Sequence, residues 1–198
     1  MKFLTMIQQL ISSYDASEIR AHDKATLCGT YPDTPPLARH IVFDPMRAKV
    51  KRALISDYKL SFPQALLDIY SSMNGANLFW SVRFIGKDRI RVPFHYLSIY
   101  GIPTNNDRKH IEPYNISVED LNRPKGTPDT WLKFGSYTLP EDIYRRWDLF
   151  VDTQTNFVYA AENGSADCCI AEKWDSIDAC LCCLFERLRE QTLGAENT

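Results

Sequence analysis

The chain has no long apolar run. No stretch of its 198 residues approaches the roughly 18 consecutive apolar residues that a membrane-spanning helix needs. Residues 1–7 are mostly apolar, but Gln8 and Gln9 interrupt them and no small-residue cleavage site follows. The sequence therefore predicts neither a membrane span nor a secretory signal, and it favours a cytoplasmic protein.

Motifs of catalysis and nucleotide binding are also missing. The chain has no G-x-G-x-x-G, P-loop, G-x-S-x-G or H-E-x-x-H pattern, and only four His. These absences leave nucleotide-dependent and zinc-protease chemistry without support. We therefore expect no cofactor and no enzymatic activity.

The composition is that of a globular domain whose charge is unevenly distributed. The chain is 44% hydrophobic and 24% charged, which is enough apolar material for one domain with its own core. Residues 1–99 hold 13 Lys and Arg against 8 Asp and Glu (+5), whereas residues 100–198 hold 10 against 17 (−7), for a net charge of −2. Nucleic-acid-binding domains are usually basic, and since the pI here is near 6.1 we expect no direct binding of nucleic acid.

Hydrophobic periodicity predicts helices near both ends and in the middle, with strands between them. This order predicts the α+β class, with a mainly antiparallel sheet and helices packed on one face of a single domain. Acid pairs at 119–120 and 141–142 are expected at helix starts, where they complement the helix dipole. The predicted helices are 2–13, 45–55, 63–73 and 176–190, and the predicted strands are 40–43, 78–84, 90–92, 95–100, 131–134, 148–152 and 156–160.

Residues 60–75 give the clearest local pattern in the chain. Pro63 suits the first turn of a helix, and apolar residues including Tyr70 then repeat at helical spacing. Asn74 and Gly75 both tolerate the left-handed conformation that ends many helices. Directly afterwards the apolar period changes to two, so a strand follows.

The order of four residues and of the elements after them resembles the signature of the SUKH superfamily. The residues are Pro63, Tyr70, Asn74 and Gly75, and strands and a C-terminal helix follow them. Members of this superfamily include bacterial immunity proteins and a yeast cell-wall regulator. The resemblance implies residues 45–190 as the SUKH-like domain. Residues 1–44 are then an N-terminal helix and extension packed on it, residues 191–198 a flexible tail, and residues 103–130 an insertion of open role.

The resemblance implies a protein that binds another protein without catalysis. Its most common form neutralises a bacterial polymorphic toxin, so the expected partner is a cognate protein toxin, and a nuclease is one candidate. One alternative is a regulatory scaffold for cellular partners. The other is a cysteine-dependent enzyme that uses either Cys28 with His22 or His40, or the cysteine cluster of the last 31 residues.

Acidic residues around the second predicted hairpin are the first candidates for partner binding. Nuclease sites are basic, and acidic groups on a partner can steer association and replace the phosphate substrate. The alternative is that these are ordinary solvated charges. The candidates are Asp148, Asp152, Glu162 and Asp167.

Three arginines of the first predicted hairpin are the second candidates. Strand alternation predicts that Arg83, Arg89 and Arg91 share one side of the two strands. They could form a solvated outer face, a nucleic-acid face or a charged rim for a protein partner. The low pI favours the charged rim.

Five of the six cysteines crowd into the last 31 residues. A chain of this length needs no disulfide staples, and no C-x-x-C knuckle falls on a turn, so reduced and metal-free thiols are expected. The alternative is one zinc ion held by four thiolates. The cysteines are Cys28, Cys168, Cys169, Cys180, Cys182 and Cys183.

Overall fold

The fold is known from a computed structural model that describes most of the chain. The predicted helix at 45–55, apart from Pro45, and the acid pair at 119–120 fall outside the described residues, and Ser56, just after that helix, is helical. The described residues are 1–22, 24–30, 38–45, 56, 62–85, 90–101, 125–164 and 167–194, with backbone alone at 30, 81–85, 90–94, 193 and 194.

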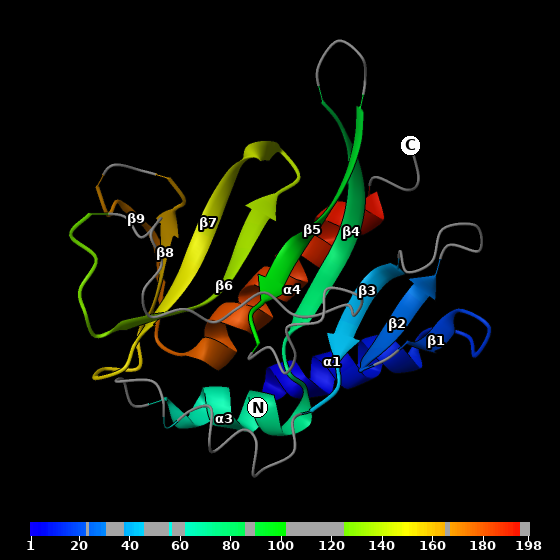
Figure 1. The fold of residues 1–198 in the computed structure, drawn as a ribbon, viewed down its shortest axis with the longest axis horizontal. Helices are drawn as coiled ribbons and strands as arrows, with labels where there is room; N and C mark the ends of the chain where they lie inside the picture. Colours follow the sequence, from blue (N-terminus) through cyan, green and yellow to red (C-terminus); the bar gives the residue numbers. More distant parts are fainter. Residues whose placement is uncertain are drawn as a thin grey trace.

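Nine strands form one antiparallel sheet in which the order in space follows the order in the chain (Figure 1). Each strand pairs only with its neighbours in sequence, and this arrangement confirms the predicted α+β class. The strands are β1 (Ile19–His22), β2 (Ala25–Thr30), β3 (Ala38–Phe43), β4 (Ala76–Ile85), β5 (Ile90–Ile99), β6 (Trp131–Leu139), β7 (Asp142–Asp152), β8 (Val158–Glu162) and β9 (Ile170–Trp174).

Three described helices, α1 (Lys2–Ser12), α3 (Gln64–Ser72) and α4 (Ile177–Gly194), bury their apolar stripes in one core cluster with the sheet. Figure 1 shows α4 crossing behind β4, β5 and β6, with α1 and α3 along the lower end. We call the face that α4 covers the inner face and the opposite one the outer face. Among the described helices, none is long and apolar enough to cross a membrane.

The starts of α1 and α4 are held together by a carboxylate. Asp178 of α4 accepts hydrogen bonds from the backbone N–H groups of Lys2 (3.0 Å) and Phe3 (2.9 Å). The first N–H groups of a helix have no acceptor within it, so this carboxylate caps α1 from another element. Ser176 caps α4 itself, because its Oγ accepts a hydrogen bond from Ala179 N at 3.1 Å.

A second polar contact fixes α4 to the inner face. Arg187 of α4 donates two hydrogen bonds of 2.9 Å to Glu172 of β9, and Tyr137 of β6 donates one of 2.8 Å. The hydrogen bonds from Arg187 keep the pKa of Glu172 below its usual range. A paired and ionised Glu172 therefore joins the helix to two strands.

The turn between α3 and β4 requires a glycine. Gly75 has φ +95°, and a Cβ there would lie 2.5 Å from the carbonyl oxygen of Ile99. On the other side, Asn74 N donates to Phe43 O (2.9 Å) and Phe43 N donates to Gly75 O (3.1 Å). The predicted left-handed conformation is confirmed at Gly75, whereas Asn74 has no positive φ, and α3 itself already ends at the extended Met73. Pro63 is the N-cap of α3, immediately before its first turn.

Some predicted elements were wrong in kind or extent. The region 15–45 contains strands β1 and β2, which are too short and too mixed in polarity to show a period. The strands expected at 90–92 and 95–100 are one strand, β5, that continues through Pro93. The acid pair at 141–142 does not start a helix, since Asp142 begins β7, and α4 continues to Gly194 into the expected tail.

Replacing Gly75 by Ala should lower the free energy of unfolding by about 2 kcal/mol or more, measured by urea unfolding. The left-handed conformation costs an L-residue about 1 kcal/mol, and the contact with Ile99 adds to it. Gly126→Ala is the matched control, because Gly126 has φ +85° and no atom within 4 Å of an added Cβ. Equal losses in the two variants would contradict a role for the close approach.

Candidate functional site

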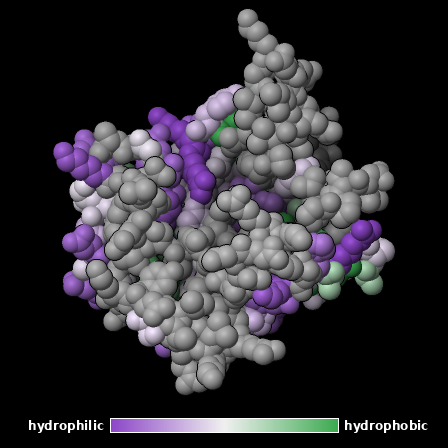
Figure 2. All heavy atoms as spheres, in the orientation of Figure 1, coloured by the Kyte–Doolittle hydropathy of each residue, from purple (hydrophilic) through white to green (hydrophobic). Residues whose placement is uncertain are grey.

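A row of directly paired residues crosses the outer face of the sheet. Ser98 of β5 pairs with Ser136 of β6, which pairs with Asp148 of β7, which pairs with Ala161 of β8. Paired residues of antiparallel strands share a face, so this row lies opposite the helix-covered core. Figure 2 views this face and shows hydrophilic side chains gathered over the upper half of β7.

Asp148 of this row forms a buried ion pair with Lys133. Lys133 Nζ is 2.8 Å from Asp148 Oδ2, with side chains 7% and 0% exposed. Asn163 Nδ2 donates to the same oxygen at 2.7 Å. The other oxygen, Oδ1, is buried without a hydrogen-bond partner in the described structure, and Arg146 Nε lies 3.9 Å from it.

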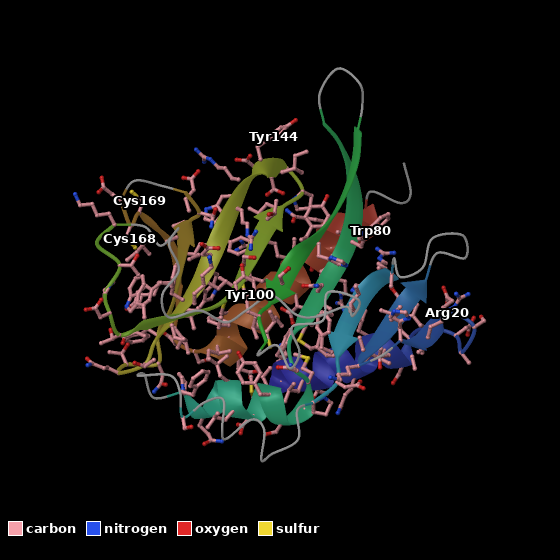
Figure 3. All side chains as sticks on the ribbon, in the orientation of Figure 1. Arg20, Trp80, Tyr100, Tyr144, Cys168 and Cys169 are labelled. Atoms are coloured by element: carbon pink, nitrogen blue, oxygen red, sulfur yellow. The ribbon has the colours of Figure 1, made fainter. Side chains whose placement is uncertain are left out.

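Tyr100 connects this ion pair to Arg146 and to the helix side of the protein. Its hydroxyl accepts a hydrogen bond from Arg146 Nη2 and donates one to Ser136 Oγ at 3.2 Å. Its backbone carbonyl accepts a hydrogen bond from the buried Tyr70 hydroxyl at 3.1 Å. Figure 3 shows Tyr100 at the end of β5, near the middle of the sheet.

We call Tyr100, Lys133, Ser136, Arg146, Asp148 and Asn163 the ionic cluster. Removing an ion pair from water costs several kcal/mol per ion, so a buried pair is weak evidence for stability alone. Such departures from an apolar interior are typical of functional sites. The Arg146 side chain is 44% exposed, so its planar guanidinium can reach a carboxylate or carbonyl of another molecule.

An aromatic patch adjoins the ionic cluster, since Lys133 pairs with Phe150. Trp131 stacks on Tyr159 with ring centroids 4.3 Å apart and 8° between the planes, and Phe150 lies 5.8 Å from Trp131. Trp131 and Phe150 are buried, whereas Tyr159 is half-buried. The outer face therefore combines fixed charges with an aromatic surface.

The four candidate acids have different environments. The prediction that Asp148 is an acid available to a partner is wrong, because it is fully buried and paired with Lys133. Burial alone would raise the pKa of Asp152, but hydrogen bonds from Gln154 N and the Thr155 hydroxyl keep that pKa below its usual range. Asp152 therefore stays ionised while it holds the β7–β8 turn.

The other two acids are accessible to solvent. Glu162 pairs with Arg145 at 3.3 Å, and the two side chains are 40% and 58% exposed. Asp167 is exposed and its backbone bridges to Lys125. Of the four candidates, Asp152 and Asp167 border the aromatic patch, because Asp152 pairs with Trp131 and Cys168, next to Asp167, packs on the patch.

The arginines do not form the predicted single row. Arg83 pairs with Val92, whereas Arg91 pairs with Phe84. Because paired residues share a face, Arg83 and Arg91 occupy positions on opposite faces, and the prediction of a common face was wrong. Arg89 lies outside the described residues.

All six cysteines are free thiols in this structure. Cys180 and Cys182 belong to the core cluster, so they fill the helix face as small apolar residues. Cys168 and Cys169 lie beside β9, where Figure 3 labels them. No group of three or more His, Cys, Asp or Glu is arranged to hold a metal ion within the described ranges.

Cys28 and His40 are brought together, since they are direct partners on β2 and β3. Burial raises the pKa of Cys28 to about 11 and lowers that of His40 to about 3. A catalytic thiol needs the reverse, a thiolate beside a proton-accepting base. His40 Nδ1 instead accepts a hydrogen bond from Phe79 N at 3.2 Å, and His22 lies exposed on β1.

Comparisons with protein-family models, with curated proteins and with solved structures give no match. The resemblance to the SUKH superfamily therefore stays a prediction.

Sequence reasoning missed the ionic cluster apart from Asp148. One signal was present: Lys133 interrupts the apolar run around Trp131 and Phe134, where a charge is rare unless it is paired. No local pattern marks Tyr100 or Arg146, whose roles depend on contacts between strands.

Replacing Lys133 by Met should lower the free energy of unfolding by about 3–5 kcal/mol, because Asp148 is then left charged and buried. The double variant Lys133→Met/Asp148→Leu should recover much of the loss in urea unfolding. Arg145→Gln is the control, and loss of its exposed pair with Glu162 should change stability by about 0.5 kcal/mol or less. A Lys133→Met loss as small as that of the control would contradict a buried charge pair.

The protein should lose stability in acid. The unfolded chain binds protons on His below about pH 6.5, whereas burial lowers the folded-state pKa of His40 to about 3 and that of His95 to about 4. Stability is therefore fully present above about pH 6.5 and falls as the pH drops, by up to about 1.4 kcal/mol per pH unit for each residue. His40→Gln should flatten this fall in urea unfolding, whereas His22→Gln, at an exposed position, should not. An unchanged slope in His40→Gln would mean that folded His40 takes up protons normally.

Proposed function

We propose that this chain is a non-enzymatic protein-binding module that neutralises a cognate protein toxin, as immunity proteins do. The SUKH-like signature supports the immunity role. Its residues have structural positions that fit such a signature, with Pro63 capping α3, Tyr70 buried and Gly75 in the tight turn. Six free thiols fit a reducing compartment, so we infer a cytoplasmic location.

The observation that carries the binding proposal is the outer face itself. It combines the ionic cluster with the aromatic patch, and tyrosine, tryptophan and arginine are the residue types that dominate binding energy at protein interfaces. Tyr144, 85% exposed, lies two residues from Arg146 on β7 and extends this composition to the tip of the hairpin (Figure 3). The sheet presents the accessible members of this face, Tyr144, Arg146 and the half-buried Tyr159, without ordering a loop, which lowers the entropy cost of binding.

The function is tested by co-expressing the protein with the product of a toxin gene adjacent to its own. We expect protection of the cells and a stable complex on copurification. Arg146→Glu should weaken the complex at least tenfold because it reverses an exposed charge of the outer face. Arg189→Glu, on the exposed side of α4, is the matched control and should bind as the wild type does.

Each outcome has a distinct meaning. Binding without protection would favour a regulatory scaffold over an immunity protein. Equal binding by the two variants, or weaker binding by Arg189→Glu alone, would move the interface away from the outer face. A wild type that neither binds nor protects would reject immunity to that toxin.

A further inference from the structure

A lysine of this chain lies over the exposed edge of the aromatic patch. Lys173 Nζ is 3.9 Å from the ring centroid of Phe157 and 5.6 Å from that of Tyr159. Lys173 is the direct partner of Tyr159 across β8 and β9, and its side chain is exposed. An exposed ammonium group is strongly hydrated, so its position over two rings indicates that the ring faces attract a cation.

The ring faces are fixed before any ligand arrives. Tyr159 is held by its stack on Trp131, 4.3 Å away, and Trp131 packs against buried Phe150. Phe157 is held by the β7–β8 turn, because its carbonyl accepts a hydrogen bond from Asp152 N at 2.9 Å. A preformed aromatic surface binds a cation without the cost of ordering its own side chains.

Carboxylates border this surface. Asp152 pairs with Trp131, the exposed Asp129 is two residues before Trp131, and the exposed Asp167 precedes Cys168, which packs on the patch. Three lysines also lie near it: Lys173 over the rings, Lys125 beside Asp167, and Lys133, whose charge is paired with Asp148. The three acids favour a cation over an anion at this position.

We propose that the surface formed by Phe157 and Tyr159 receives a lysine or arginine side chain of the protein partner, and that Lys173 occupies it as an internal competitor until then. The identity of the partner rests on the proposed function, whereas the affinity for a cation does not. Lys173 leaves the rings when the incoming cation binds, so its removal makes the surface more accessible. The ionic cluster lies beside this surface and supplies Arg146 as a second contact.

The test is an NMR titration of the isotope-labelled protein with N-acetyl-arginine amide and N-acetyl-lysine amide, followed at the Trp131 indole N–H. Lys173→Ala should bind these cations about tenfold more tightly than the wild type, because the competitor is gone. Lys125→Ala is the matched control, since it removes an exposed lysine of the same region without vacating the rings. It should bind as the wild type does.

The double variant Lys173→Ala/Phe157→Leu should not show the tighter cation binding of Lys173→Ala, because leucine keeps the apolar volume but has no ring face. Unchanged signals from the rest of the protein will show that this variant is folded. The neutral probe N-acetyl-glutamine amide should bind none of the variants. The proposal is overturned if Lys173→Ala binds the cations no better than the wild type does, or if the neutral probe binds equally well. If the protein binds the cations but does not bind the toxin, the proposed partner is rejected, whereas the cation site on Phe157 and Tyr159 is still supported.

Discussion

The close approach of Gly75 to the end of β5 is the constraint on which much of this structure depends. The missing side chain lets the α3–β4 turn touch the carbonyl oxygen of Ile99, and the same turn exchanges hydrogen bonds with Phe43 at the end of β3. One residue further, Tyr100 accepts a hydrogen bond from Tyr70 of α3, and its N–H donates to Phe134 of β6 at 2.8 Å. Five elements, α3, β3, β4, β5 and β6, therefore meet at this turn, and Tyr100 is fixed with them.

Through this junction, contacts on the inner face fix a residue whose side chain reaches the outer face. The backbone of Tyr100 is held from the helix side, whereas its hydroxyl bonds Arg146 and Ser136 within the ionic cluster. Each face has its own charged network. Glu172 and Arg187 join α4 to the sheet on the inner face, and Lys133 and Asp148 are buried on the outer face. The inner network stabilises the packing of a helix, whereas no described helix packs over the outer one.

The proposed function depends on this difference between the faces. The charge pair on the outer face is buried within the chain itself, whereas Arg146 beside it remains 44% exposed and is the charge that a partner would meet. The Cys28 thiol and the His40 imidazole lie side by side but are not activated. Burial shifts the pKa values of Cys28 and His40 away from the values that a nucleophile and its base need, although the two residues are direct partners. Cys28 and His40 are therefore not arranged as an activated thiol and its base.

The sequence by itself determined the class of fold, the helices α1, α3 and α4, and the left-handed conformation of Gly75. Each of these follows from a local period or from the steric freedom of one residue, which neighbours in the chain already define. Only the tertiary structure decided that β1 and β2 are strands, that Arg83 and Arg91 occupy positions on opposite faces, and that Asp148 is buried against Lys133. Strand pairing and burial depend on residues far apart in the chain, and a shift of one position in register exchanges the two faces. The site lies on a sheet face, so the register of the strands, and not the local sequence, decided which residues belong to it.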